Sequence, residues 1–543
     1  MGRVPTVSDA LEDALRRALD HTGVTAPETI TLERPARREH GDWSSNVALA
    51  TAKAAGRNPR ELATQVVELL NTDPPAHVQR AEVAGPGFVN FHLAPSWLHD
   101  VLSDVVTRGE KDYARHESGQ GERIQVEFVS ANPTGPIHVG NGWFASYGDS
   151  VGRLLERVGY DVHREYYVND TGGQVRQLGA TVLARRNGQP VPAGGYPSGF
   201  VKGLASAYDG PEDIETAGRW AAERILGFIQ GQMAAVNIHY DEWFSQASIE
   251  DSAAVAETID LLRARGLVWE EDGALWLDTG RFGDPREKRV VRKSPDQGGD
   301  YTYIAGDIAY HRNKFLLRGF DRVINVWGAD HQGQVPSLLA GVEALGVEPG
   351  RLEIRVGQMV SLASGRIGKR LGNAVDLDEV VDEVGADVMR LLSLVSSIDQ
   401  SATVDLDKVR SESKESPVFY VQYAHARIHS IARYADTQGV VRLPLDQVDL
   451  SPLSSERELE VLRSLSQLPE VVALAAEERA PHKVTTWVRE LADRFHGFYH
   501  DHRVIGDEVS AAETQARLWL VEATRTGLAI GLDLLGVDAP EQM

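Results

Sequence analysis

Apolar residues near the start of the chain recur at the spacing of a helix. Residues 11–19 place leucine and alanine on one face, and residues 59–70 repeat that pattern. Residues 81–93 alternate instead as in a strand, around a Gly-Pro-Gly break. Because a chain of 543 residues is too long for one core, we expect about three domains. The first is predicted to be a small α+β domain over residues 1–115.

Three apolar segments in the middle of the chain have the pattern of strands, and each ends in a polar, glycine-containing turn. The strands are residues 126–129, 162–168 and 323–327, and the turns are residues 132–136, 169–174 and 328–333. The carboxyl ends of parallel strands meet at one edge of an α/β sheet, where nucleotides bind. We therefore predict a Rossmann-type catalytic domain over residues 116–405, with an insertion at about 195–300. The competing interpretation is that these segments are ordinary turns.

The last part of the chain, from about residue 406, has a helical pattern to its end. Residues 418–428, 487–499 and 517–535 each carry an apolar stripe. This predicts an all-α domain over residues 406–543. His496, His500 and His502 have a spacing that metal ligands use, but the helix lacks the glutamate of a zinc protease helix, so we predict no metal site.

Composition narrows the classes of function. The chain has no cysteine, which excludes disulfides, thiolate zinc sites and catalytic cysteines. A net charge of −23 opposes indiscriminate binding of nucleic acid, so RNA would bind at local basic clusters such as Arg34, Arg37 and Arg38, or residues 288–293. Such clusters are by themselves typical of solvated surface. No apolar run reaches the ~20 residues that a bilayer needs, and we expect a cytoplasmic protein without a membrane partner.

Residues 127–147 form the segment around which the chain is organised. A strand pattern leads into a proline- and glycine-rich turn, and a helix pattern begins near Trp143. His138, Gly140 and Asn141 then lie near the positive end of a helix, where backbone N–H groups favour phosphate. Gly140 allows a nucleotide to approach the backbone, and His138 can donate a hydrogen bond to a phosphate oxygen. A four-residue pattern alone is equally typical of a turn.

The surroundings of this segment carry a resemblance to a known family. His138-Val139-Gly140-Asn141 is similar to the His-x-Gly-His signature of class I aminoacyl-tRNA synthetases, and residues 131–136 before it resemble arginyl-tRNA synthetases in particular. Asn141 replaces the second histidine of the signature, and Trp143 stands where the family more often has arginine. Further similar segments occur along the whole chain, at residues 40–53, 58–63, 84–93, 417–428 and 534–543.

A cationic, glycine-rich loop over residues 365–373 precedes an acidic helix that is expected to start near Asp378. Fixed positive charge on such a loop suits a pyrophosphate leaving group, whose charge grows in the transition state. The loop resembles the family's Lys-Met-Ser-Lys-Arg-x-Gly-Asn segment. Lys369 falls on its second lysine, whereas Arg366 and Gly368 replace the first lysine and the serine, so the positive charge is kept and one hydroxyl is lost.

The resemblance implies ATP-dependent ligation of L-arginine to tRNA(Arg) through an arginyl-adenylate, with Mg²⁺ accompanying the nucleotide, no DNA partner and a monomeric chain. It assigns catalysis to His138, Asn141 and Lys369. It assigns ATP binding to Pro133, Gly135, His138, Gly140, Asn141, Asp330, His331, Arg366 and Lys369. It assigns arginine binding to Glu127, Asn132, Tyr303 and Asp307, and tRNA binding to Arg37, Tyr423 and Met543.

The arginine assignment also fits physical chemistry, because a planar guanidinium needs a carboxylate that accepts paired hydrogen bonds. Two other functions stay open at this point. One is a repurposed or inactive relative that binds tRNA without efficient charging, which Trp143, Arg366 and Gly368 motivate. The other is a tRNA-independent nucleotidyltransferase, for which the first ~115 and last ~138 residues would be superfluous.

Overall fold

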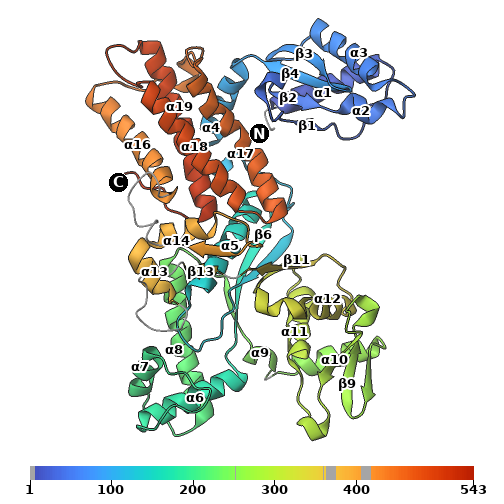
Figure 1. The fold of residues 1–543 in the computed structure, drawn as a ribbon, viewed down its shortest axis with the longest axis vertical. Coiled ribbons are helices and arrows are strands. Elements are labelled where there is room, and N and C mark those ends of the chain that lie inside the picture. The colour runs from blue at the N-terminus through green and yellow to red at the C-terminus, as the bar shows by residue number, and fades with distance from the viewer. Residues whose placement is uncertain (1–5, 251, 359, 363–374, 405–416) are drawn as a thin grey trace. The chain divides into compact units, whose positions relative to one another are not determined.

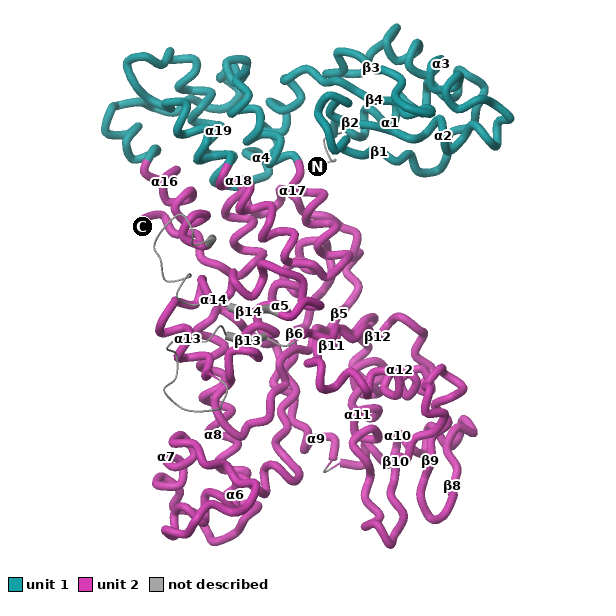
Figure 2. The backbone as a smooth tube through the Cα atoms, in the orientation of Figure 1, with its two compact units in different colours: residues 1–109, 431–466, 494–526 teal, residues 110–430, 467–493, 527–543 magenta. Residues whose placement is uncertain are grey.

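The computed structural model describes residues 6–250, 252–358, 360–362, 375–404 and 417–543. These residues form two compact units (Figure 2). The first comprises residues 1–109, 431–466 and 494–526, and the second comprises residues 110–430, 467–493 and 527–543. The sheet that corresponds to the predicted catalytic domain lies wholly in the second unit.

The N-terminal part of the first unit is an α+β module. Its antiparallel sheet has the order β1-β2-β4-β3, with β1 at Leu32–Glu33, β2 at Trp43–Ser45, β3 at Val78–Ala84 and β4 at Phe88–Leu93. Its helices are α1 (Val7–His21), α2 (Val47–Ala52), α3 (Pro59–Thr72) and α4 (Ser96–Asp112). Residues 81–93 form a hairpin rather than one strand, because Gly85 and Gly87 adopt φ angles of 50° and 144° and reverse the chain.

A five-stranded parallel sheet forms the centre of the second unit. Its order is β12-β11-β5-β6-β7, with β5 at Arg123–Phe128, β6 at Asp161–Val168, β7 at Glu242–Ser245, β11 at Arg322–Gly328 and β12 at Leu352–Gly357. Strand order reverses between β5 and β11, as in a Rossmann fold. Burial explains these strands, since Ile124, Val126 and Phe128 of β5 are fully covered.

The α-helices between residues 139 and 393 accompany this sheet (Figure 1). They are α5 (Val139–Arg157), α6 (Gly172–Arg186), α7 (Gly199–Ala207), α8 (Ile214–Ala235), α9 (Ala247–Glu250), α10 (Ala254–Ala264), α11 (Tyr303–Arg312), α12 (Val335–Ala344), α13 (Leu377–Val384) and α14 (Ala386–Ser393). A separate antiparallel sheet contains β8 (Val268–Glu271), β9 (Ala274–Asp278) and β10 (Lys288–Arg292), and β13 (Val360–Leu362) pairs with β14 (Ala402–Val404). The segment expected as an insertion therefore also supplies β7 to the central sheet.

Four long helices end the chain, α16 (Pro417–Thr437), α17 (Glu456–Glu478), α18 (His482–Asp501) and α19 (Ala511–Leu535). The predicted combination of an α+β region, a Rossmann-type sheet and a C-terminal helical region is confirmed. Among the described residues, no helix is long and apolar enough to cross a bilayer.

Candidate active site

The loop after β5 leaves the strand in a strained conformation. Val129 and Ser130 adopt φ angles of 73° and 44°, which β-branched and other non-glycine residues rarely take. Hydrogen bonds hold this turn: the Ser130 hydroxyl donates to Glu127 Oε1 at 3.0 Å and accepts from the Tyr167 amide at 3.1 Å, and Asn169 donates to the Ser130 carbonyl at 3.1 Å. Strain of this kind collects at functional sites, where surrounding contacts stabilise it.

A cavity of about 1190 Å³ opens at the carboxyl ends of β5 and β11, where the order of the central sheet reverses. A ligand that binds in an open α/β sheet binds at this point. The following predicted site residues line the cavity: Glu127, Asn132, Gly135, His138, Gly140, Asn141, Tyr303, Asp307, Asp330 and His331. The cavity thus collects predicted residues from three separate segments of the chain, residues 127–141, 303–307 and 330–331.

Part of the cavity lining is formed by the segment that enters α5, together with residues 328–331 and 357–358, and we call it the nucleotide wall after the ligand that the sequence predicts there. His138 is the N-cap of α5, and Gly140 and Asn141 lie in the first turn of that helix. Burial lowers the pKa of the His138 imidazole, and the Asp376 carboxylate only partly offsets this effect. The imidazole is therefore neutral at pH 7 and keeps one N–H to donate.

The backbone around His138 pairs with the segment that follows residues 363–374. The Val139 amide donates to the Val375 carbonyl at 2.9 Å, and the Leu377 amide donates to the Ile137 carbonyl at 2.8 Å. Lys369, Arg366 and Gly368 lie outside the described residues. Val375, the first described residue after that segment, follows Lys369 by six positions in the sequence.

Another part of the lining carries the acids, and we call it the arginine wall after the ligand that the sequence predicts there. Glu127 comes from the end of β5, and Tyr303 and Asp307 come from the first and second turns of α11. Enclosure within the cavity and the charges of Glu127 and Glu250 raise the pKa of Asp307 to about 7, although Lys314 acts in the opposite direction. Tyr303 is 83% exposed, so its side chain is available to a ligand.

A chain of buried polar groups lies behind the arginine wall. Lys314, in the π-helical turn Asn313–Leu317, donates to Glu127 Oε2 at 2.5 Å and to Asn325 Oδ1 at 3.1 Å. Asn325 Nδ2 lies 2.9 Å from His311 Nε2, and His311 Nδ1 lies 2.7 Å from the Asp307 carbonyl. Burial, with the nearby charge of Lys314, lowers the pKa of His311 to about 3, so this histidine is neutral.

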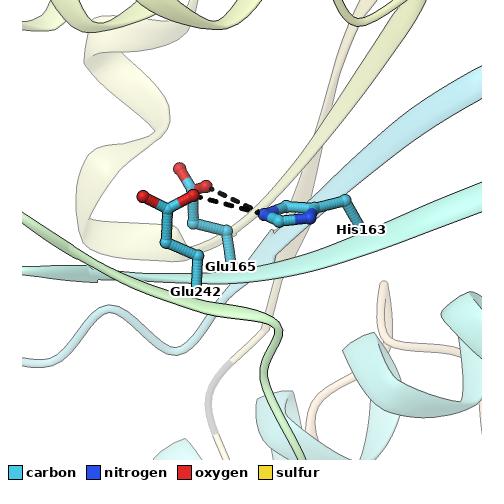
Figure 3. Close-up of side chains that lie close together, drawn as sticks. All are labelled: His163, Glu165 and Glu242. Atoms are coloured by element: carbon cyan, nitrogen blue, oxygen red, sulfur yellow. Dashed lines mark ion pairs between the residues drawn. The ribbon is translucent and has the colours of Figure 1, made fainter. Parts of the chain in front are cut away.

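A second charged cluster lies deeper in the sheet, where His163, Glu165 and Glu242 bring three groups of the kind that bind metals together (Figure 3). Arg318 Nη2 lies within hydrogen-bonding distance of all three, at 3.0 Å from His163 Nε2, 2.5 Å from Glu165 Oε2 and 2.7 Å from Glu242 Oε2. The guanidinium therefore supplies the positive charge that a metal ion would bring. Glu165 in turn accepts the hydroxyl hydrogen of Tyr310, whose side chain lines the cavity.

The remaining predicted residues do not line the cavity. Pro133 is buried in the loop beside it. Arg37 is 77% exposed and pairs with Glu39 at 3.4 Å, in the first unit. In the second unit, Tyr423 OH accepts a hydrogen bond from Arg427 at 2.6 Å, and Met543 is 57% exposed at the chain end.

Comparison with known proteins identifies the family. The model of the class I (R) tRNA synthetase catalytic domain matches residues 102–190 and 206–431, the arginyl tRNA synthetase N-terminal domain matches residues 6–93, and the DALR anticodon binding domain matches residues 421–543. The chain belongs to the arginyl-tRNA synthetase family. Arginine–tRNA ligase from Carboxydothermus hydrogenoformans is 41% identical over an alignment of 567 positions, which covers 99% of each chain.

Solved structures agree with this membership of the arginyl-tRNA synthetase family. A putative arginyl-tRNA synthetase from Campylobacter jejuni is 31% identical, with a TM-score of 0.75 over 83% of this chain and all of that one. The Thermus thermophilus arginyl-tRNA synthetase shares the fold, with a TM-score of 0.78, 24% identity and coverage of 99% of this chain and all of that one.

The structure also explains one departure from the arginyl-tRNA synthetase pattern. Trp143 is 6% exposed on the inner side of α5 and does not line the cavity, so an aromatic side chain there contributes to packing. Sequence reasoning missed Lys314 and Phe144. The signal for Lys314 was a single lysine among apolar residues, at positions 314–317, directly after α11.

Proposed function

We propose that this protein ligates L-arginine to tRNA(Arg) with ATP, through an arginyl-adenylate, and releases AMP and pyrophosphate. The observation that carries the proposal is one cavity, at the reversal point of a Rossmann-type sheet, with paired carboxylates on one side and a helix N-terminus on the other. Membership of the arginyl-tRNA synthetase family over the whole chain supports the same reaction.

In the first step, a carboxylate oxygen of arginine attacks the α-phosphorus of ATP, and the bond from that phosphorus to the pyrophosphate oxygen breaks. In the second, a hydroxyl of the terminal ribose of tRNA attacks the activated carbonyl, and AMP leaves with the electron pair of the broken bond. Such chemistry depends on positioning and on stabilisation of phosphate charge. We assign these tasks to His138, Asn141 and Lys369, with Mg²⁺ accompanying the nucleotide.

ATP would lie along the nucleotide wall. The positive end of the α5 helix favours a phosphate, and a neutral His138 donates a hydrogen bond that strengthens as charge grows. Asp330 and His331 lie on the same side of the cavity and could contact the ribose or base. We include Gly135 and Gly140 in the ATP site because a glycine, which has no side chain, lets a nucleotide approach the backbone closely. We retain Pro133, Arg366 and Lys369 as members of this site from the resemblance to the family.

Arginine would lie along the arginine wall, with its guanidinium between Glu127 and Asp307. Asn132 and Tyr303 would orient the substrate through an amide and a phenol, which hydrogen-bond without adding charge. A carboxylate pair accepts the planar donor array of a guanidinium, whereas the single ammonium of a lysine would leave acceptors unmatched.

We propose three functional regions for the transfer RNA. Residues 1–115, with Arg37, would contact the tRNA body, residues 116–405, with their insertion at about 195–300, would hold its acceptor end, and residues 406–543, with Tyr423 and Met543, would bind the anticodon. We propose a monomer that works in the cytoplasm, where translation consumes its product.

Charging of purified tRNA(Arg) with radiolabelled arginine, in ATP and Mg²⁺, tests this function beside ATP–pyrophosphate exchange with and without the tRNA. We expect arginine-dependent charging. Binding of tRNA without charging would overturn the proposal in favour of a repurposed relative, and exchange that ignores arginine would favour a tRNA-independent nucleotidyltransferase.

A further inference from the structure

Lys314 is a completely buried cation directly behind the arginine wall. Its side chain has no solvent exposure, and it does not itself line the cavity. Its ammonium donates to Glu127 Oε2 at 2.5 Å and to Asn325 Oδ1 at 3.1 Å, and it lies 4.2 Å from the centre of the Tyr310 ring. A buried cation is costly unless it is paired, so its position implies a specific partner charge.

The charges of the site can be added up group by group. Glu127 and Asp307 contribute two negative charges to the arginine wall when both are ionised, and Lys314 contributes one positive charge. His311 and Tyr310, which lie beside these groups, are uncharged, because burial lowers the pKa of His311 to about 3 and raises that of the Tyr310 hydroxyl. Glu127, Asp307 and Lys314 together therefore present one net negative charge to the ligand when Asp307 is ionised.

We propose that Lys314 is a positioning residue for the amino-acid substrate: its pairing with Glu127 sets the arginine site at one net negative charge, which matches the single positive charge of a guanidinium. Lys314 thus holds Glu127 toward the cavity and neutralises its charge, so that Asp307 supplies the net negative charge. The proposal rests on the function proposed above and adds a residue that sequence comparison with the signature segments does not single out.

The charged groups around Lys314 define how the site should respond to pH. Glu127 faces it from β5, Asp307 and Tyr310 from α11, and Asn325 from β11. Glu165 acts on it at longer range, and hydrogen bonds from His163 and Arg318 hold the pKa of Glu165 down at about 2 despite its burial. Glu250 lies near enough to Asp307 to add to the rise of its pKa to about 7. Asp307 therefore ionises within the pH range over which charging can be measured.

The two neighbours of Asp307 act on its ionisation in opposite directions. The negative charge of Glu127 raises the pKa of Asp307, and the positive charge of Lys314 lowers it. Removal of Lys314 should therefore move the ionisation of Asp307 to higher pH by about one unit or more, and removal of the Glu127 charge should move it to lower pH. Removal of both charges should largely restore the original value.

The experiment measures kcat/KM for arginine in tRNA charging from pH 6 to pH 9, for the full chain and the variants Lys314→Met, Glu127→Gln and the double variant. The ratio of variant to wild type at each pH cancels the ionisation of the substrates. For Lys314→Met we expect this ratio to fall by about tenfold or more from pH 9 to pH 6.5. For Glu127→Gln the ratio should rise toward low pH, and for the double variant it should stay flat.

One control variant and one fallback comparison accompany this experiment. Lys483→Met removes a partly exposed lysine that pairs with Glu478 at 3.1 Å, and its ratio should stay near one at every pH. Lys314→Met leaves Glu127 without its partner, and thermal melting shows whether this variant folds. Where it does not fold, the effect of removing Lys314 on the ionisation of Asp307 is measured by comparing Glu127→Gln with the double variant, because both lack the Glu127 charge.

A constant loss for Lys314→Met at every pH would overturn the proposal, because a merely structural lysine would lower the yield of active enzyme without moving the ionisation. Shifts of the profile in the same direction for Glu127→Gln and Lys314→Met would overturn it as well. Absence of charging by the wild type would instead overturn the proposed function, so the two failures are distinguishable.

Discussion

The two walls of the cavity recognise their ligands in different ways. The arginine wall consists of ionisable side chains on regular elements, β5 and α11, and the buried Lys314 pairs with one of them, Glu127. The nucleotide wall consists mainly of a turn, glycines and the N-terminal end of α5, with His138 as its main side-chain donor. We therefore propose that charge and geometry of side chains select the amino acid, whereas backbone shape and the helix terminus receive the phosphates.

The largest effect that separates the two walls should come from pH. Since the pKa of Asp307 is raised to about 7, the carboxylate is protonated below that pH and arginine must displace a proton to bind. We expect kcat/KM for arginine to fall about tenfold for each pH unit below 7, which is about a hundredfold at pH 5. The KM for ATP should not follow this dependence. A profile for arginine that is flat between pH 5 and 8 would contradict the role of Asp307.

Asp307→Asn tests the same wall by substitution. The amide leaves the guanidinium without a charged acceptor, which costs about 1.5–3 kcal/mol, so the KM for arginine should rise by roughly tenfold or more. The tenfold loss per pH unit should also disappear in this variant. Unchanged arginine kinetics would refute the assignment of Asp307.

Gly357→Ala tests the nucleotide wall. A Cβ at this position would come within 2.2 Å of the Phe144 ring, which lines the cavity, so the ring must move. Overpacking of this kind costs about 1–3 kcal/mol, and we expect the KM for ATP to rise by roughly tenfold with arginine little affected. Gly227→Ala is the matched control, because Gly227 is exposed within α8 and its Cβ would meet nothing within 4 Å. An equal loss in both variants would exclude Phe144 as the cause.

The smallest effect should come from Tyr303→Phe. Tyr303 is largely exposed, and loss of one neutral hydrogen bond costs about 0.5–1.5 kcal/mol, so the KM for arginine should rise only severalfold. Steady-state charging at varied arginine measures this change. A loss as large as that of Asp307→Asn would mean that the phenol, rather than the carboxylate, dominates recognition.

These predictions also show what the sequence could and could not reveal. The strands and the signature turn are local patterns, so they predicted the Rossmann-type fold, whereas the resemblance to the family supplied the predicted arginine-binding residues that the cavity collects. The pairing of Lys314 with Glu127 joins positions 187 residues apart, and it depends on the register of β5 with β11 and on a π-helical turn. No local pattern encodes that contact.

The division into compact units was equally beyond local patterns. The contiguous domains that meet near residues 115 and 405 stay a prediction. The compact units are discontinuous in sequence and divide α16, α17, α18 and α19 between them. A long helix reads in sequence as one element with one apolar stripe. Which neighbours its two halves contact depends on tertiary packing, which the stripe does not specify.

Charging kinetics with arginine and ATP varied in turn, for the wild type, Asp307→Asn and Gly357→Ala, test the division of the cavity most directly. We predict that the wild type charges tRNA(Arg), that Asp307→Asn raises the KM for arginine alone, and that Gly357→Ala raises the KM for ATP alone. Equal changes for both substrates in both variants, or no charging by the wild type, would contradict this account.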